Sequence, residues 1–430
     1  MIQRLTATIG FFGNILRDLA GSLRARWRQF HARVVLGEEI GAVGVDIYPF
    51  FERMTGVGWY EWNLLAALDD RSDGLTFNLY ARTFFAPDEA PPPEMPGNRN
   101  MRFRVHQIPP GFLLPIRPTL NILRMVVEPL LRTFDGNAVL FAPNFFLHSD
   151  QEPFGGTQVA TVHDLAFVAM PETVSPATLD GLNRHLPRTL FHAGRLIAVS
   201  ENTAGELIDR LGADGRVVRT IHEGVDPGFV EGDDEAPDGV PSSYLLFVST
   251  LEPRKNVAGV LRAFRLLVEW GYGGDLVLVG RWGWHTEGIR QELDDSPVRG
   301  RVLHLDYVDR LRLAALYRHA DALLFPSWLE GFGLPLVESM ACGTPVITSG
   351  TSAMPEIAGP AAVYVDPASP HGIASATAAL LTDPQHRERL VRLGRERAGK
   401  FSWERAAQAT AAVLRDAAGL SVDGEDEYRA

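Results

Sequence analysis

Two basic side chains stand where a predicted buried strand leads into a helix. Arg254 and Lys255 lie between the apolar run at residues 244–248 and an amphipathic stretch that begins at Val257. The N-terminus of a helix carries partial positive charge, so each cation there costs ~0.3–1 kcal/mol unless an anion lies against the backbone amides. Only two of the 41 basic residues are lysines, so a lysine in this loop favours a phosphate-binding site. The alternative is a solvated surface pair.

Two carboxylates follow the apolar run at residues 322–325. Glu330 is expected in the loop at the end of this strand, and Glu338 on the helix that follows. Gly331 and Gly333 allow a backbone to approach a ligand closely. Carboxylates in these positions can accept hydrogen bonds from sugar hydroxyls. The alternatives are a helix cap for Glu330 and a solvated helical acid for Glu338.

A histidine and a glycine-bearing turn stand out in the first half of the chain. The predicted strand at residues 158–162 ends at His163, so we expect the imidazole to project into a cleft. Gly56 and Gly58 precede a predicted helix, in a turn that is open to a phosphate or an acceptor. The alternatives are a structural histidine and a plain turn.

Short apolar runs alternate with amphipathic stretches, the pattern of parallel sheets covered by helices. The first series predicts strands at residues 43–47, 75–80, 102–107, 138–141, 158–162, 196–199 and 217–221, and helices at 58–68, 118–131, 177–191 and 202–211. The second predicts strands at 244–248, 275–279, 302–305, 322–325, 345–348 and 362–365, and helices at 257–270, 311–319, 334–340 and 373–381. Two doubly wound α/β domains should face each other across a cleft, with the chemistry in the loops after the strands.

Length and composition agree with this organisation. The 430 residues exceed what one core usually organises, and 46% hydrophobic with 22% charged residues is typical of a globular chain. The net charge of −12 disfavours a nucleic-acid binder. The lone Cys342 fits a reducing compartment and small-residue packing, and no apolar run reaches the ~18 residues of a membrane span.

The charge divides unevenly along the chain. Residues 1–34 carry six Arg and one Asp, or +5, which leaves −12 − 5 = −17 for the rest. Apolar residues at helical spacing run beside these arginines, which is typical of an interfacial helix. The alternatives are packing on the parent domain, a dimer contact and a signal peptide.

These patterns together predict the domain boundaries. We predict a basic arm at 1–40, a first domain at 41–223, a linker at 224–243, a second domain at 244–400, a helix at 401–418 that returns to the first domain, and an acidic tail at 419–430.

The order of motifs resembles the retaining glycosyltransferases of family 4, whose two-domain architecture is called GT-B. The resemblance spans residues 43–403. Its most specific element is Glu330-Gly-Phe-Gly-Leu-Pro-Leu-Val-Glu338, followed by Ala-Cys-Gly-Thr-Pro-Val-Ile. Supporting elements are Thr161-Val-His-Asp164, Ala198-Val-Ser-Glu201, Gly224-Val-Asp226, Glu252-Pro-Arg-Lys-Asn256 and Met354-Pro-Glu356.

The resemblance implies a role for each matching residue. Arg254 and Lys255 would neutralise the diphosphate of a nucleotide sugar, Glu330 would hold hydroxyls of the donor sugar, and Glu338 would hold the ribose. His163 would face the sugar. The remaining binding residues would be Gly56 and Gly58 at the reaction centre, Gly280, Arg281, Tyr307 and Val308 near the base, and Gly331, Phe332, Gly333 and Leu334 in the glutamate motif. The family's chemistry uses no metal and no cofactor besides the nucleotide sugar, and Asp233-Asp234 lies in the expected linker, where it looks unsuited to metal binding.

Two departures from the family bear on the substrate. Ser249-Thr250 stands where many relatives have Gly-Arg, and Glu223 where many have Asn. A mannosyltransferase-like branch shares Thr-Leu-Glu-Pro-Arg-Lys-Asn, which favours mannose and GDP-mannose. The resemblance thus implies transfer of a hexose to a glycan or lipid-linked acceptor in surface polysaccharide synthesis, in the cytoplasm or peripherally on the inner face of the membrane. The alternatives are a GT-B nucleotide-sugar epimerase, a glycan phosphorylase, and a non-catalytic nucleotide-sugar-binding scaffold.

Overall fold

The computed structural model describes residues 24, 27, 41–47, 54–71, 74–80, 101–104, 135–145, 156–232 and 235–420. Of the basic arm, only Arg24 and Trp27 are described, both exposed and in helical conformation. The rest of the arm, the predicted helix at 118–131, residues 105–107 of a predicted strand, Asp233-Asp234 and residues 421–430 lie outside the described residues.

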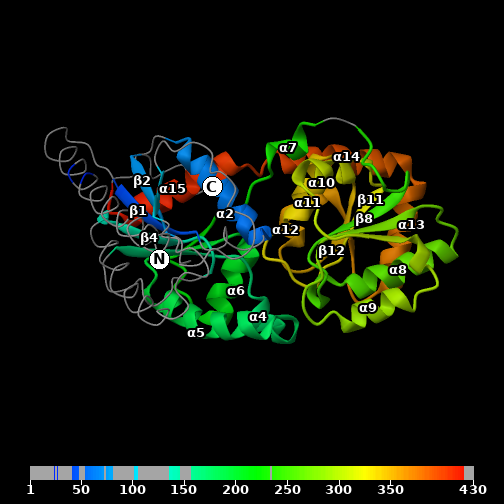
Figure 1. The fold of residues 1–430 in the computed structure, drawn as a ribbon, viewed down its shortest axis with the longest axis horizontal. Coiled ribbons are helices and arrows are strands. Elements are labelled where there is room, and N and C mark those ends of the chain that lie inside the picture. Colours follow the sequence, from blue (N-terminus) through cyan, green and yellow to red (C-terminus); the bar gives the residue numbers. More distant parts are fainter. Residues whose placement is uncertain are drawn as a thin grey trace, which may run out of the picture.

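The first half of the chain forms a seven-stranded parallel sheet in the order β3-β2-β1-β4-β5-β6-β7 (Figure 1). Its strands are β1 (Gly41–Asp46), β2 (Leu75–Tyr80), β3 (Met101–Arg104), β4 (Val139–Ala142), β5 (Thr157–Val162), β6 (Arg195–Ala198) and β7 (Val218–Thr220). Its helices are α2 (Gly56–Asp69), α4 (Ala166–Ala169), α5 (Pro176–His192) and α6 (Glu201–Leu211), with the 3-10 turn η5 (Pro171–Thr173).

The second half forms a six-stranded parallel sheet in the order β10-β9-β8-β11-β12-β13. Its strands are β8 (Tyr244–Val248), β9 (Asp275–Val279), β10 (Val302–Leu305), β11 (Ala322–Phe325), β12 (Val346–Ser349) and β13 (Ala362–Val365). Its helices are α8 (Val257–Glu269), α9 (Glu287–Asp294), α10 (Arg310–His319), α11 (Leu334–Ala341), α12 (Met354–Ala358), α13 (Pro370–Thr382) and α14 (Pro384–Ala398), with the 3-10 turn η6 (Pro253–Lys255). Two facing doubly wound sheets confirm the predicted fold class.

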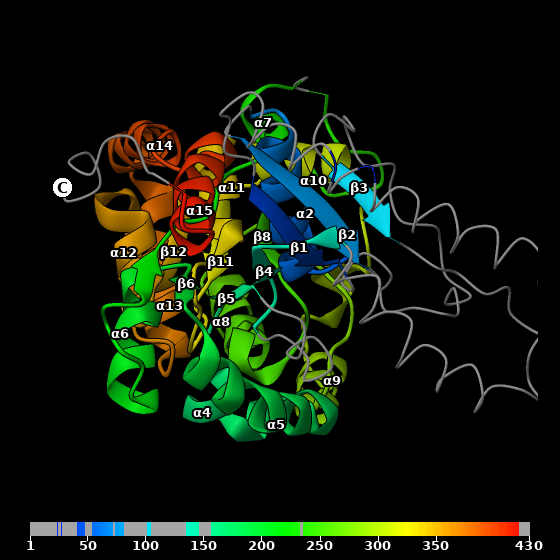
Figure 2. The ribbon, with the colours of Figure 1, turned by 90° about the vertical axis from the view of Figure 1, so that its left-hand side faces the viewer.

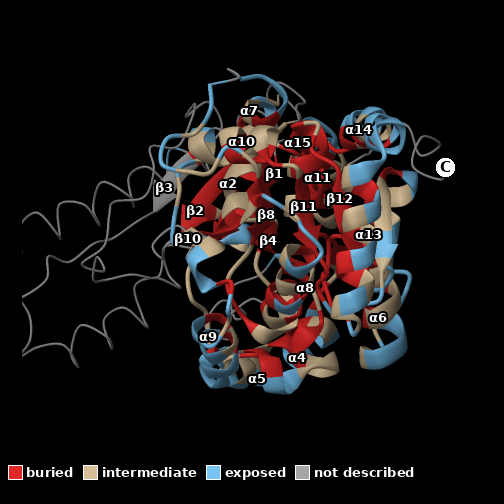
Figure 3. Ribbon diagram, turned by 90° about the vertical axis from the view of Figure 1, so that its right-hand side faces the viewer, coloured by how far each residue is buried: buried red, intermediate tan, exposed pale blue. Residues whose placement is uncertain are grey.

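Each sheet has a switch point where the strand order reverses, at β1–β4 and at β8–β11. The central strands are buried runs such as β4 and β8, which parallel sheets covered on both faces require (Figure 3). At a switch point the loops after neighbouring strands run to opposite faces and leave a crevice. The loops after β1, β8 and β11 adjoin these crevices, and β5, which ends before His163, is the next strand beyond β4. The other selected residues, Gly280, Arg281, Tyr307 and Val308, follow β9 and β10.

The chain passes between the halves twice, and the two passages lie side by side. Val225 forms a parallel bridge with Ser402, and its backbone N–H donates to the Phe401 carbonyl at 3.2 Å. A side chain on Gly224 would overlap the backbone of Trp403, so only glycine permits this approach. Beyond the passage, α15 (Trp403–Ala417) packs against α2 and β5 of the first half (Figures 1 and 2).

The structure contains helices that the sequence patterns did not predict. In α14 the buried positions are only Leu390, Gly394 and Ala398, and most other side chains are charged, so its apolar stripe is weak. In α9 the eight residues bury Ile289 and Leu293 alone. The helices α4, α7 (Pro227–Val230) and α12 have four or five residues, too few to show a period, and α7 falls inside the predicted linker.

Candidate active site

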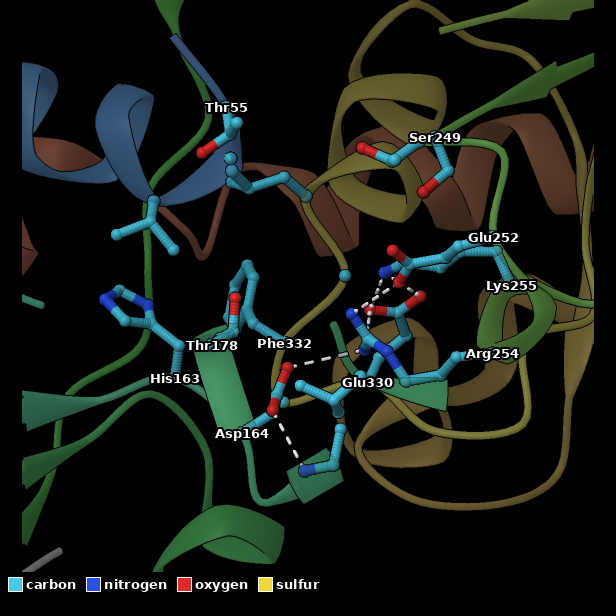
Figure 4. Close-up of a pocket in the computed structure, with 18 of the residues that line it drawn as sticks. Thr55, His163, Asp164, Thr178, Ser249, Glu252, Arg254, Lys255, Glu330 and Phe332 are labelled. Atoms are coloured by element: carbon cyan, nitrogen blue, oxygen red, sulfur yellow. Dashed lines mark hydrogen bonds and ion pairs between the residues drawn. The ribbon is translucent and has the colours of Figure 1, made fainter. Parts of the chain in front are cut away.

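A cavity of about 720 Å³ lies between the carboxyl ends of the two sheets. Both halves line it: Asp46, Gly56 and His163 from the first, and the loops after β8 and β11 from the second (Figure 4). Eleven of the fifteen residues selected from the sequence contribute to the lining: Gly56, His163, Arg254, Lys255, Arg281, Glu330, Gly331, Phe332, Gly333, Leu334 and Glu338. The structure thus brings together residues up to 282 positions apart, from Gly56 to Glu338.

Four of the selected residues do not line the cavity. Gly58 faces the side chain of Met54, and Gly280, at φ 138°, leaves room for the Ser249 carbonyl where the loops after β8 and β9 meet. Tyr307 is 51% exposed, and Val308 packs at the edge of the core. Gly58 and Gly280 thus pack closely against other parts of the protein, and direct contact of either with a ligand stays a prediction.

The Lys255 ammonium is held by Glu330. Its Nζ donates to both carboxylate oxygens, at 2.7 and 2.6 Å, and both side chains are nearly buried. Lys255 belongs to η6, and Asn256, at φ 59°, separates this turn from α8. Asn256 donates to the carbonyls of Pro326 and Pro367, which ties the turn to neighbouring loops. The alternative of a solvated surface pair is wrong.

Arg254 is surrounded by carboxylates from both halves of the protein. Its guanidinium lies 3.0 Å from Glu252, 3.6 Å from Glu330 and 3.4 Å from Asp164, which comes from the loop after β5 (Figure 4). Burial lowers the pKa of Arg254, but these carboxylates, Asp164 foremost, raise it by a larger amount. The net shift of the pKa is therefore upward. The expected anion beside the two cations is present already, as side chains of the protein. A bound phosphate would have to take their place.

Glu330 and Gly331 sit where the two halves touch. The Glu330 backbone N–H donates to Ser352 Oγ at 3.2 Å, and Ser352 Oγ donates back to the Glu330 carbonyl at 2.6 Å. A side chain on Gly331 would overlap the His163 carbonyl oxygen. The space beside this glycine is thus taken by the opposite half of the protein. The N-cap of α11 is Gly333, so Glu330 is not the helix cap.

Glu338 lies half-buried on α11, at the edge of the cavity. Tyr317 donates its phenolic hydrogen to Glu338 Oε2 at 2.9 Å. Burial raises the pKa of the Glu338 carboxyl to about 7, and the nearby Arg310 only partly offsets this shift. The alternative of a solvated helical acid is wrong.

His163 is fixed at both ring nitrogens. Its Nε2 donates to the Pro143 carbonyl at 2.8 Å, and its Nδ1 lies 3.4 Å from Glu223 Oε1. The ring of Tyr60 meets the imidazole edge to face, with centroids 4.7 Å apart. Because a carbonyl can only accept, Nε2 must carry a hydrogen. His163 is therefore held rigidly against the cavity.

Sequence reasoning missed three further cavity residues. Asp164 and Glu252 stand inside quoted motifs, next to His163 and Arg254, but nothing in the sequence shows that they approach the same guanidinium. Glu223 was noted only as a departure from the family pattern. Its contact with His163 joins residues 60 positions apart, so spacing could not reveal it.

A resident metal or a reactive thiol gains no support from the described residues. They contain no cluster of three or more potential metal ligands. Burial raises the pKa of the Cys342 thiol to about 12, and its Sγ donates to the Phe229 carbonyl, as expected of a small packing residue. None of the helices in the described ranges is long and apolar enough to cross a membrane.

Comparisons with known proteins agree with this geometry. Residues 54–229 match the family described as Glycosyltransferase Family 4, and residues 237–397 match Glycosyl transferases group 1. The chain is 29% identical to O-antigen chain mannosyltransferase B of Escherichia coli, over 62% of this chain and 71% of that protein. It is 32% identical to D-inositol 3-phosphate glycosyltransferase of Thermobifida fusca, over 52% of this chain and 56% of that protein.

Solved structures share the fold across most of the chain. Sucrose-phosphate synthase from Thermosynechococcus elongatus superimposes with a TM-score of 0.68 at 21% identity, covering 87% of this chain and 98% of that one. Anabaena HepE, solved with UDP and glucose, gives 0.65 at 17% identity, covering 87% and 99%. The two facing sheets therefore form a GT-B fold.

Proposed function

Because the chain is a glycosyltransferase with a GT-B fold, we propose that it transfers mannose from GDP-mannose to a glycan or lipid-linked acceptor in surface polysaccharide synthesis, with retention of the anomeric configuration. One observation carries the proposal: Arg254, Lys255 and Glu330 form a charged cluster that faces His163 within one cavity. The similarity to an O-antigen mannosyltransferase supports mannose as the sugar.

Binding of the nucleotide sugar exchanges partners within the cluster. In the structure Lys255 is paired with Glu330, and Arg254 with Glu252, Asp164 and Glu330. A diphosphate that enters the cavity takes over the two cations, since charge-assisted hydrogen bonds to phosphate are strong. Glu330 is then free to accept hydrogen bonds from the sugar hydroxyls. The ion pairs thus keep both groups in place until the substrate replaces them.

Sugar transfer develops negative charge on the departing diphosphate and positive charge on the anomeric carbon. Arg254 and Lys255, whose side chains are nearly buried, stabilise the first from fixed positions in the cavity. The acceptor attacks from the face that the diphosphate leaves, and the departing phosphate takes the acceptor proton. In this scheme two protein cations do the work of a divalent metal, so we expect transfer to continue in EDTA.

We also propose where the protein acts and what its N-terminal arm contacts. We place the reaction in the cytoplasm, on the inner face of the membrane, with residues 1–34 as the contact because of their +5 charge. Deletion of residues 1–34 should abolish co-sedimentation with anionic vesicles and spare transfer to a soluble acceptor. Unchanged sedimentation would refute the membrane contact.

A panel of nucleotide sugars tests the proposed donor. A ligand that binds only the folded state raises its melting temperature by mass action, so GDP-mannose should shift Tm more than UDP-glucose, GDP alone or mannose. Incubation with the stabilising donor and acceptor glycans should then yield an α-linked product, the configuration of the donor.

The same assays separate the competing enzymes. An epimerase converts the donor without an acceptor, and a phosphorylase consumes orthophosphate. A β-linked product would reject retention. Stabilisation by UDP-glucose alone would reject GDP-mannose and leave the transferase assignment in place.

A further inference from the structure

The short segment from Ser352 to Glu356 contacts both halves of the protein. At its start, Ser352 exchanges two hydrogen bonds with the backbone of Glu330, and the Ala353 N–H donates to the Glu330 carbonyl at 3.4 Å. At its end, Glu356 in α12 is not among the residues that line the cavity. This one segment therefore holds the backbone of a cavity glutamate and also reaches the first half.

The Glu356 carboxylate binds the start of α6 in the first half. Oε1 accepts from the backbone N–H of Glu201 at 2.9 Å and from His222 Nε2 at 2.6 Å, and Oε2 accepts from the Asn202 N–H at 3.0 Å. The α6 N-cap, Ser200, satisfies only the N–H of Thr203. Glu356 thus supplies the acceptors that the helix itself leaves unfilled, from the other half of the protein.

The electrostatics agree with a firm contact. Burial alone would raise the pKa of Glu356, but the hydrogen bonds from His222 and from the two backbone amides outweigh it and lower the pKa. The positive end of the α6 dipole acts in the same direction. Helices α6 and α12 lie side by side in two perpendicular views (Figures 1 and 2).

The same helix end also touches the cavity loop. Thr203 Oγ1 donates to the Gly331 carbonyl at 3.3 Å, and Gly331 packs against the His163 carbonyl. The His222 ring, held by Glu356, lies 6.1 Å from the ring of Phe332, which lines the cavity. A displacement of α6 from Glu356 would therefore disturb the contacts of Gly331 and Phe332.

We propose that Glu356 is a positioning residue for sugar transfer. Its carboxylate latches the two halves together and so holds the loop from Glu330 to Phe332 against His163. The role in transfer rests on the proposed function, whereas the latch itself does not. Glu356 acts only through α6 and His222, at a distance from the reacting atoms.

A distance measurement tests the latch without any substrate. Spin labels on Asn183→Cys in α5 and Gln291→Cys in α9 report the separation of the halves. Both positions are exposed, and the two helices belong to opposite halves of the protein. The buried Cys342 thiol should not react. Glu356→Ala is expected to lengthen and broaden the distance distribution, and Glu388→Ala on the exposed face of α14 to leave it unchanged. An unaltered distribution in Glu356→Ala would overturn the latch.

Kinetics then test the positioning role. Glu356→Ala should lower kcat at least tenfold and leave the affinity for free nucleoside diphosphate within twofold, because Arg254 and Lys255 belong to the second half alone. Glu356→Gln, which keeps an acceptor oxygen, should recover part of the loss. If Glu356 were only structural, Glu356→Ala would lower the melting temperature without lowering kcat selectively relative to nucleoside diphosphate affinity. That result would refute the positioning role.

A milder variant covers the case in which Glu356→Ala does not fold. His222→Asn removes one of the three hydrogen bonds and leaves both backbone contacts. It should give an intermediate distance distribution and an intermediate kcat, and wild-type values for both would count against the latch. If the wild-type protein transfers no sugar from any donor, the proposed function fails, and the distances still decide whether Glu356 joins the halves.

Discussion

The two halves of the protein hold their buried charged groups in different ways. In the second half, Lys255 and Arg254 lie within 2.6–3.6 Å of carboxylates and have at most 14% of their side chains exposed. In the first half, Glu61 in α2 does not line the cavity; it is fully buried, and neither of its oxygens has a hydrogen-bond partner. The second half balances its buried cations with ion pairs, whereas the first half contains a carboxyl whose pKa is raised mainly by burial, and also by Asp46.

The difference separates function from stability. A paired cation can exchange its carboxylate for a phosphate, because the phosphate supplies the opposite charge that the carboxylate supplied before. A buried carboxyl without a cation is driven toward its neutral form, since burial penalises the charged one. We therefore expect charge removal in the second half to damage transfer, and charge removal in the first half to increase stability.

The largest effect should come from Lys255→Ala. Loss of one preorganised group that stabilises developing charge typically costs on the order of 3 kcal/mol, or about 10²-fold in kcat/KM. Loss of this ammonium also leaves Glu330 without its closest partner. Steady-state transfer kinetics measure the effect. The matched control is Lys400→Ala, at the chain's exposed second lysine, and near-normal turnover by folded Lys255→Ala would show that the ion pair is only structural.

Most of the architecture could be predicted because it is encoded locally. Buried strands such as β8 and β11 are short continuous apolar runs, and helices such as α8 carry one apolar face at helical spacing, so the sequence shows both directly. The charged helix α14 was missed because most of its surface faces solvent. Its own start signals, Asp383 as N-cap followed by a proline, were present and could have revealed it.

The site could be predicted on one side better than on the other. Lys255 and Glu330 belong to recognisable motifs at strand ends, and parallel topology brings such ends together. The partner of His163 depends on which residue of a distant loop, Glu223, reaches the imidazole. Gly331 lines the cavity, as the expected approach to a ligand requires, but the sequence did not show that it also packs against the His163 carbonyl. Contacts between the halves depend on how two domains pack, which no local pattern records.

Gly331→Ala should break the contact between the two halves directly. The new methyl group would overlap the His163 carbonyl oxygen, a backbone atom that cannot rotate away. The halves must then separate, and displacement of reacting groups by about 1 Å can cost up to 10²-fold in rate. We expect kcat to fall about 30-fold while nucleoside diphosphate still binds. Gly288→Ala in α9, where the methyl group meets open space, is the control, and equal rates for the two variants would contradict the packing.

The pH dependence of the nucleotide-sugar KM sharpens the comparison within the second half. Glu330 has a lysine partner, whereas burial raises the pKa of Glu338 to about 7. If both oxygens of Glu338 accept hydrogen bonds from the ribose, the carboxyl must first lose its proton, which happens as the pH rises through about 7. The KM should therefore fall by up to about tenfold between pH 6 and pH 8. The KM of Glu338→Gln should not change between pH 6 and pH 8. A wild-type KM that rises over the same range would exclude ribose binding by the Glu338 carboxylate.

The smallest effect concerns stability, at Glu61 in the first half. Burial, with the nearby Asp46, raises the pKa of Glu61 well above its ordinary value. The folded protein then holds the proton more tightly than the unfolded chain, so stability falls as the pH rises from about 4.5 through the raised pKa. Glu61→Gln removes this loss and should raise the free energy of unfolding at pH 8 by about 1 kcal/mol, with a smaller gain at pH 5. Urea denaturation at both pH values measures the difference, with the exposed Glu269→Gln as control. A gain that is equal at the two pH values, or a loss at pH 8, would show that Glu61 is charged in the folded protein and that the first half is balanced like the second.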